Sequence, residues 1–359
     1  LWYIQEVEDY RTDSRIVNTS LLGTDWYIDQ MTRKAYLSEP VPFTIPEYIY
    51  RQGGAIDQFE LDDSESQNVV LDLKAELEKQ KDNPRKSKRY SAEWVILDGK
   101  SFFIKVNKEN AVKYGICPKG MEDQMVDRIE FRIQDNVLMK SDFMILDLLA
   151  NYDWKRPIYF ATGNSSKEYL GLDNYFVQEG LAYKLVPIPQ QGSRYSLGGM
   201  NIEKTYAMLM GTSKNADENF EWGGMDEANA NVDFYVRRTI CASYHTVFMA
   251  LAGALIDEPA MLDEQITQKE FEIRVIQDSI AANADSSQLK NRMSSLNADL
   301  KALRERKNKY DYLDMAKKVI NRCFEVMPPE NVPYDTYTQF FVELLFQAGD
   351  KENAIKHLK

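Results

Sequence analysis

The feature that most constrains the fold is the segment from Trp154 to Asn164, which reads WKRPIYFATGN. It follows directly on the run from Ser141 to Asn151, whose residues are apolar around nearly the whole circumference of a helix. Proline opens a short β-prone stretch, and glycine with asparagine closes it. The pattern predicts a buried helix, a tight link, a buried strand and a polar loop at the strand's carboxyl end. In open α/β sheets, ligands bind at that position.

A similar unit is predicted upstream. Residues Arg15–Leu22 are typical of a strand, and Gly23 leads into a helix that Thr24 caps and whose positive end Asp25 complements. The proline-rich stretch 40–46 must be extended. Together these patterns predict a first β-to-α unit followed by an extended crossover.

Further strands are indicated between these units and after them. Residues 94–97 and 102–106 flank Asp98-Gly99, which predicts a hairpin. Alternation over 128–134 predicts a half-buried strand. Residues 174–179 are predicted to be a short helix that ends at Gly180, and 181–186 a strand. We therefore expect a three-layer, Rossmann-like α/β domain with a mixed sheet over residues 1–200.

From residue 201 to 359 the sequence predicts an all-α domain. Helical apolar spacing recurs over 234–256, 312–326 and 337–347, and the pattern FQAGD with Ala354 is typical of tetratricopeptide repeats. Residues 262–307 interrupt this region. Isoleucines and leucines there recur at steps of three, four and seven, which predicts an inserted antiparallel coiled-coil hairpin.

Composition narrows the range of functions. The net charge of −12 disfavours nucleic acid as a partner, although PRKSKR at 84–89 forms one basic stretch that we interpret as a solvated loop. Three cysteines show neither disulfide nor zinc spacing, and only two histidines occur. We interpret His245 as a packed helical residue and expect no metal, no cofactor and no catalytic residue in this chain.

The ends of the chain suggest a longer protein. There is no run of about 18 apolar residues, so we expect neither a membrane span nor a signal peptide within these residues. The chain begins at Leu1 without methionine and stops at Lys359 inside a helical pattern. We interpret both ends as cuts, with a membrane anchor expected in the missing N-terminal part.

Four stretches carry a family resemblance: 16–30 (IVNTSLLGTDWYIDQ), 138–142 (LMKSD), 151–161 (NYDWKRPIYFA) and 179–183 (EGLAY). They resemble the soluble C-terminal region of a bacterial polytopic membrane protein family. That family is similar to the membrane protein O-mannosyltransferases, which carry tetratricopeptide repeats after their membrane core. The resemblance implies a glycosyltransferase whose catalytic acid and lipid-linked sugar donor belong to a membrane portion outside this sequence. It also implies a location at the periplasmic face of the inner membrane.

Candidate ligand-binding residues follow the two predicted strands. They are Asp25, Trp26, Tyr27, Arg156, Asn164 and Ser165. Carboxylate and amide groups hydrogen bond sugar hydroxyls, and aromatic rings stack on a sugar face. The alternative is structural, since the same residues serve as helix caps, core rings and turn formers. Arg156 in particular is expected to pair with an acid such as the buried Asp147.

Three functional hypotheses result. The first is an extracytoplasmic accessory domain of a membrane glycosyltransferase, which binds an acceptor protein or partner subunit beside its own N-terminal membrane domain. The second is a small-molecule or sugar-binding α/β module or enzyme, with a crevice near Asp25 and Asn164. The third is an assembly domain that forms a homodimer through the coiled-coil hairpin.

Overall fold

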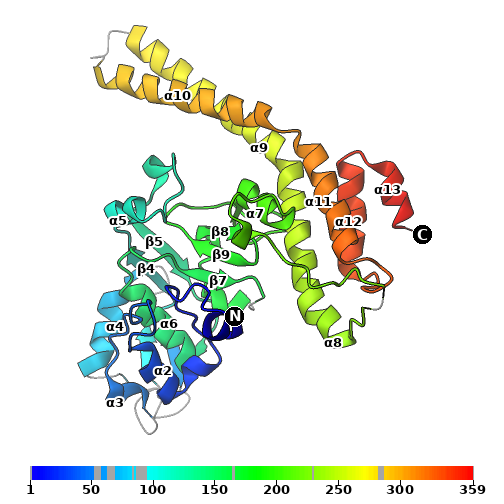
Figure 1. The fold of residues 1–359 in the computed structure, drawn as a ribbon. Coiled ribbons are helices and arrows are strands. Elements are labelled where there is room, and N and C mark those ends of the chain that lie inside the picture. Colours follow the sequence, from blue (N-terminus) through cyan, green and yellow to red (C-terminus); the bar gives the residue numbers. More distant parts are fainter. Residues whose placement is uncertain are drawn as a thin grey trace. The chain divides into compact units, whose positions relative to one another are not determined.

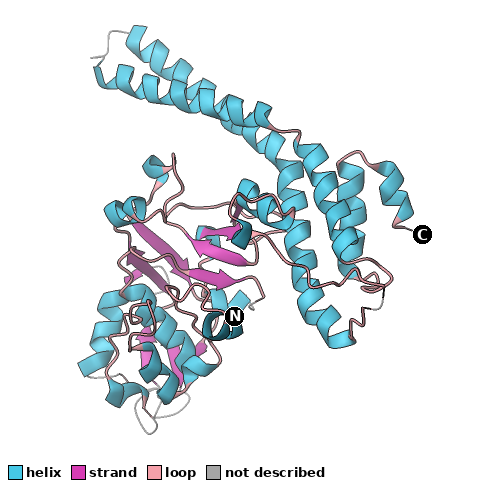
Figure 2. Ribbon diagram, viewed as in Figure 1, coloured by secondary structure: helices cyan, strands magenta, loops and turns pink. Residues whose placement is uncertain are grey.

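The computed structural model describes residues 2–51, 58–62, 69–82, 85, 95–163, 166–228, 230–281 and 287–358. The chain divides into two compact units. The first contains residues 1–160, 164–176 and 184–190, and the second contains 161–163, 177–183 and 191–359. Strands are concentrated in the N-terminal half and long helices in the C-terminal region (Figures 1 and 2). The predicted change from mixed α/β to helical structure is confirmed.

Two sheets lie in the first unit. In one, β1 (Gln58–Asp62) is parallel to β3 (Val95–Asp98) and antiparallel to β6 (Val137–Met139). In the other, β4 (Ser101–Lys105) is parallel to β2 (Leu71–Asp72) and antiparallel to β5 (Arg128–Arg132). The helices of this unit are α1 (Trp2–Val7), α2 (Asp25–Met31), α3 (Glu47–Tyr50), α4 (Leu73–Asp82), α5 (Lys108–Lys113) and α6 (Lys140–Ala150).

A further sheet has the order β10-β8-β9-β7. Its strands are β7 (Tyr159–Ala161), β8 (Phe176–Glu179), β9 (Ala182–Leu185) and β10 (Gly199–Met200). The described strands therefore form three small sheets, and the predicted Rossmann-like arrangement is not confirmed. The predicted helix at 174–179 was wrong, because only a 3₁₀ turn at Asp173–Tyr175 precedes β8.

The predicted hairpin around Asp98-Gly99 was also wrong. The two strands that it would join, β3 and β4, lie in different sheets. The Gly99 amide donates instead to the Asp62 carbonyl, at the end of β1, over 2.5 Å. An Asp-Gly pair indicates that the chain turns, but contacts with residues far along the sequence determine which strands pair.

The expected strand at 15–22 is irregular and ends in a 3₁₀ turn, Leu21–Gly23. The buried Tyr27 hydroxyl accepts a bond from the Asn18 amide (2.9 Å) and donates to the Ile16 carbonyl (3.2 Å). The Asn18 side chain accepts from the Leu21 amide. Side chains thus satisfy backbone groups that a strand would have paired with a neighbour.

Helix α6 forms the centre of the first unit, as its apolar circumference predicted. Phe143, Met144 and Leu146 are fully buried, and the Phe143 ring meets Phe59 of β1 edge-on at 4.9 Å. Asp142 accepts from the Met139 amide and so closes the first turn of α6. This helix packs against β1 and β6, two strands of the first sheet.

The second unit is helical. Its helices are α7 (Ile202–Leu209), α8 (Phe234–Val236), α9 (Ala242–Ala281), α10 (Ser287–Lys309), α11 (Tyr312–Val326), α12 (Thr336–Gln347) and α13 (Lys351–Lys356), with a π-helical turn at Arg237–Cys241 before α9. The first part of α9 packs in one core with α7, α11 and α12. His245 is buried there beside Phe341 and Asp335, as its interpretation as a packed residue predicted. Tetratricopeptide-like regularity is not confirmed.

The C-terminal part of α9 and α10 form an antiparallel pair. Ile273, Ile276, Leu296 and Leu300 fill the seam between them, and ion pairs Lys269–Asp299 (3.3 Å) and Glu270–Arg304 (2.6 Å) flank it. In Figure 1 the two helices run side by side, and the ion pairs Asp263–Lys307, Lys269–Asp299 and Glu272–Arg292 follow opposite orders along them, which gives the antiparallel direction. The seam residues are those whose heptad spacing predicted the hairpin.

One described helical stretch, Phe234–Ala281, is long and apolar enough to cross a membrane by length and composition. Its most apolar window of 18 residues has a mean hydropathy of 1.6, and 56% of that window is buried inside the protein. The central helix of a soluble core has the same properties. The sequence-based expectation missed this window because isolated polar residues interrupt it.

Candidate functional site: a polar cavity beside strand β5

The structure describes four of the six predicted site residues: Asp25, Trp26, Tyr27 and Arg156. Asp25 lies in the first turn of α2 and forms an ion pair with Lys140 at 3.0 Å. The Lys140 ammonium group is buried and also donates to the Tyr50 carbonyl over 2.7 Å. Tyr27 is only 1% exposed, whereas Trp26 is 57% exposed. The binding role of these residues stays a prediction.

Arg156 donates to two carbonyl oxygens, of Glu39 (2.8 Å) and Pro40 (2.9 Å), and so holds the extended crossover. The expected partnership with Asp147 was wrong. Asp147 accepts instead from the Thr44 amide (2.5 Å) and hydroxyl (2.7 Å) and from the Ile45 amide. Asn164 and Ser165 lie outside the residues that the structure describes, as does most of the 84–89 stretch.

A different site emerges beside β5, an edge strand of its sheet. Ile129 and Phe131 point into the core, while Arg128, Glu130 and Arg132 point outward. The strand pattern RIEFR thus presents alternate charged side chains on one face. The Ile133 amide donates to the Lys100 carbonyl, which continues the pairing with the β4 side of the sheet.

The segment 166–175 faces this strand. Four buried side chains anchor it: Tyr169, Leu170, Leu172 and Tyr175. In the same segment, Lys167, Asp173 and Asn174 line a cavity of about 520 Å³. Leu170 and Gly171 both adopt positive φ, 54° and 80°. Such backbone conformations are costly for leucine and are concentrated at functional sites.

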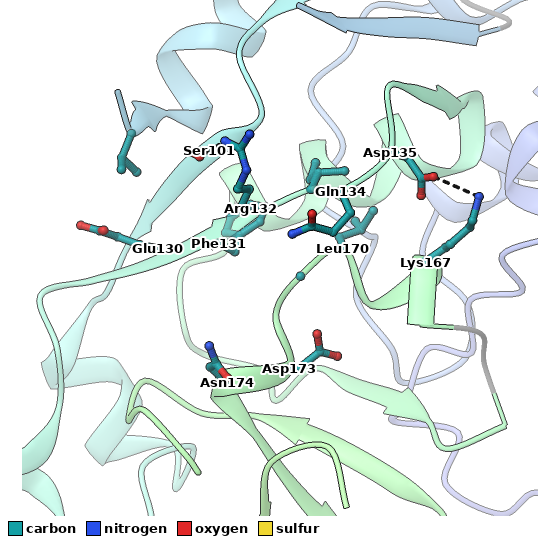
Figure 3. Close-up of a pocket in the computed structure, with 13 residues that line it drawn as sticks. Ser101, Glu130, Phe131, Arg132, Gln134, Asp135, Lys167, Leu170, Asp173 and Asn174 are labelled. Carbon is teal, nitrogen blue, oxygen red and sulfur yellow. Dashed lines mark hydrogen bonds and ion pairs between the residues drawn. The ribbon is translucent and has the colours of Figure 1, made fainter. Parts of the chain in front are cut away.

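Figure 3 shows the polar groups that surround this cavity. Lys167 and Asp135 form an ion pair at 3.0 Å, and Arg132 donates to the Ser101 hydroxyl over 2.8 Å. Gln134 and Asn174 add amide groups to the wall. The cavity therefore offers donors and acceptors of both charges, and its volume lies in the range of small-ligand pockets.

Asp173 is the least compensated group of the wall. One of its carboxylate oxygens, Oδ1, is buried and has no hydrogen-bond partner among the described residues. Burial raises the pKa of the Asp173 carboxyl. Asp173 lines the cavity, so its carboxylate is an acceptor that a ligand with a hydroxyl or amide donor would meet there. The part of the chain that the structure describes contains no group of three His, Cys, Asp or Glu side chains that could hold a metal ion.

Sequence reasoning did not find this cavity. Its lining residues come from four separate stretches, at Val70, at Ser101, at 130–135 and at 167–174. The one local signal is the run Tyr169–Asn174 (YLGLDN), in which glycine interrupts buried apolar residues just before two polar ones. That signal is typical of a tight loop, and it does not show which strand the loop approaches.

The fold and the cavity define a mixed α/β domain with a helical extension. The family model of TMEM260-associated domain 2 matches residues 1–204, more than half of the chain, and the chain belongs to this family. TMEM260 is a membrane protein family, so the domain is one associated with a membrane protein. No curated protein and no solved structure matches the chain.

Proposed function

We propose that this chain is the extracytoplasmic, non-catalytic domain of a membrane glycosyltransferase of the O-mannosyltransferase type, and that it binds the acceptor protein. In this proposal the domain lies at the periplasmic face of the inner membrane, and a separate membrane portion carries the catalytic acid. The cavity beside β5 is the main support, because the family match over 1–204 includes every residue of its wall.

The chemistry of the wall suits recognition of a polar surface. Lys167 and Asp135 neutralise each other at 3.0 Å, and Arg132 donates one hydrogen bond to the Ser101 hydroxyl over 2.8 Å. Asp173 lines the same cavity and contributes a carboxylate that accepts hydrogen bonds. Serine and threonine hydroxyls, which such a transferase modifies, are donors of the required kind.

The test uses the intact membrane protein with polyprenyl-phosphate-linked mannose as donor. Transfer to acceptor protein and hydrolysis of the donor by water are measured in the same preparation. For Asp173→Asn and Lys167→Ala we expect the acceptor KM to rise about tenfold, while kcat and donor hydrolysis stay unchanged.

A matched control is Lys155→Ala, which removes an exposed ion pair with Asp153 (2.8 Å) outside the cavity. It should leave the acceptor KM unaltered. Equal KM values for the cavity variants and wild type would contradict acceptor binding at this cavity. Absence of any mannose transfer by the intact protein would contradict the glycosyltransferase assignment.

The second candidate is a sugar-binding or small-molecule module. The cavity volume of about 520 Å³ favours it, because a monosaccharide would fit there. Titration of the 359-residue chain with D-mannose, followed by NMR, distinguishes the two. Saturable shifts in Asn174 and Gln134 side-chain amides that Asp173→Asn abolishes would support the module. Unchanged spectra at high sugar concentration would contradict it.

A further inference from the structure

The N-terminal helix α1 has an inverted distribution of side chains. Its buried residue is Gln5, whose amide donates to the carbonyl oxygens of Arg11 and Ser14, each over 2.9 Å. Tyr3 and Val7, four residues apart, share another face and are 66% and 59% exposed. A helix that buries a glutamine side chain and exposes its apolar side chains is expected to contact an apolar surface outside the unit.

A tight turn extends this exposed surface. Ala35 and Ser38 pair through both backbone bonds, so Tyr36 and Leu37 are held at the tip of the turn. Leu37 is 73% exposed, the largest value among the exposed large apolar residues that the structure describes. The Tyr36 hydroxyl donates to the Glu6 carboxylate of α1, which fixes the turn beside the helix.

Two tryptophans complete the surface. The rings of Trp2 and Trp26 both pack on the buried ring of Tyr27, at 6.4 and 5.5 Å between centroids, so they lie on the same part of the unit. Both are exposed. We define the aromatic patch as Trp2, Tyr3, Val7, Trp26, Tyr36 and Leu37.

The composition of the patch identifies its partner. Most of its residues are tryptophan or tyrosine, which combine an apolar ring with a polar tip and concentrate at the membrane–water interface. Two ion pairs lie nearby, Arg11–Asp13 (2.8 Å) and Lys34–Glu39 (2.9 Å), and the acidic residues Glu6, Glu8 and Asp9 add negative charge, which disfavours an anionic lipid surface. Such a surface suits a zwitterionic headgroup layer better than a strongly charged one. The chain also belongs to a family of domains associated with membrane proteins.

We propose that the aromatic patch lies on the lipid bilayer, with Leu37 and Tyr3 inserted at the headgroup–acyl boundary. This inference is independent of acceptor binding at the β5 cavity, because the residues of the two surfaces do not overlap. It assigns α1 and the turn 35–38 as the lipid-facing surface of the first unit.

The experiment is flotation of the 359-residue chain with phosphatidylcholine vesicles. We expect wild type to float with the vesicles in both low and high salt, and the double variant Tyr3→Glu/Leu37→Glu to bind at least about tenfold more weakly. The control is Phe271→Glu on the hairpin, where the side chain is 64% exposed; it should float like wild type. Failure of wild type to float, or equal loss in the control, would overturn the proposal.

A second measurement locates the contact. Brominated phosphatidylcholine should quench tryptophan fluorescence in wild type, and the quenching should fall sharply in Trp2→Phe/Trp26→Phe while binding persists. Quenching that survives this double substitution would place another surface on the lipid and refute the assignment. A dimer in vesicle-free solution that Leu37→Glu dissociates would also refute it, because a second copy would then cover the patch.

Discussion

Gly171 lies so close to β5 that a Cβ atom at this position would stand 2.2 Å from the carbonyl oxygen of Arg132. This contact brings the polar residues of segment 166–175 to within reach of the strand and forms one side of the cavity. A backbone oxygen cannot move aside as a flexible side chain can, so the position requires glycine both for its positive φ and for its lack of a side chain.

Gly171→Ala should therefore lower the free energy of unfolding by more than about 2 kcal/mol. The matched control is Gly115→Ala, where φ is also positive (+65°) but a Cβ atom would have no described neighbour within 4 Å. There we expect only the conformational cost of about 1 kcal/mol. Chemical denaturation of both variants measures the difference, and equal costs would show that the approach to Arg132 is looser than described.

Asp173→Asn should make the protein more stable at neutral pH. The raised pKa of the carboxyl means that the folded state binds this proton more readily than the unfolded state does. The stability contribution of Asp173 is thus fully present below its unfolded pKa and is lost as pH rises through the folded value. The amide removes that loss, so we expect a melting temperature above that of wild type at pH 7 and no gain near pH 3.

The same variant is expected to weaken acceptor binding, which separates function from folding. A residue that lowers stability yet improves binding is typical of a functional site. A melting temperature that falls at pH 7 would indicate that Asp173 is instead paired in the folded protein.

Lys140→Met should destabilise the first unit by about 2–4 kcal/mol, because it takes the buried cation away from the Asp25 carboxylate and the Tyr50 carbonyl. Asp25→Asn should cost less, since Asp25 keeps some exposure to water. In a double-mutant cycle the two effects should be strongly non-additive. Additive costs would show that the Asp25–Lys140 ion pair contributes little to stability. They would then support the prediction that Asp25 binds a ligand.

Leu300→Ser should open the helical hairpin without affecting the first unit. Leu300 lies in the seam of α9 and α10 with Ile273 and Ile276, so we expect a cost of about 2–4 kcal/mol confined to this region. Hydrogen exchange should accelerate over 262–309 and stay unchanged in β5. Val275→Ser, at an exposed position of α9, should leave exchange unaltered.

This result bears on the dimer hypothesis. The seam that suggested a contact between two chains is filled inside one chain, so loss of a dimer in Leu300→Ser would not distinguish a broken interface from a melted hairpin. A homodimer through the hairpin stays a prediction, and exposed positions such as Phe271 are the ones that can test it.

The elements that could be predicted are those with a strong local period. The apolar circumference of α6, the alternation in β5 and the heptads of α9 and α10 each depend on residues close in sequence. The failures depend on distant residues. Nothing in Arg15–Leu22 indicates that the Tyr27 hydroxyl would take its backbone bonds, and nothing near Gly99 indicates pairing with Asp62.

The candidate site also depends on contacts between residues far apart in the sequence. Asp25, Trp26 and Tyr27 were predicted from their place after an expected strand, but that strand does not form, and the ion pair with Lys140 joins residues 115 positions apart. The cavity beside β5 likewise combines Ser101, Glu130 and Asp173, which no single motif contains. A sequence pattern gives side-chain chemistry, whereas close approaches such as that of Gly171 decide which groups meet.

The two units are interleaved along the sequence, and this determines how the chain can be divided. Residues 161–163 and 177–183 belong with the helical unit, although they are made before residues 184–190 of the first unit. Neither unit is therefore complete as one uninterrupted stretch. A gene fusion cut at a single point in the chain would therefore leave short pieces of one unit on the wrong side of the cut.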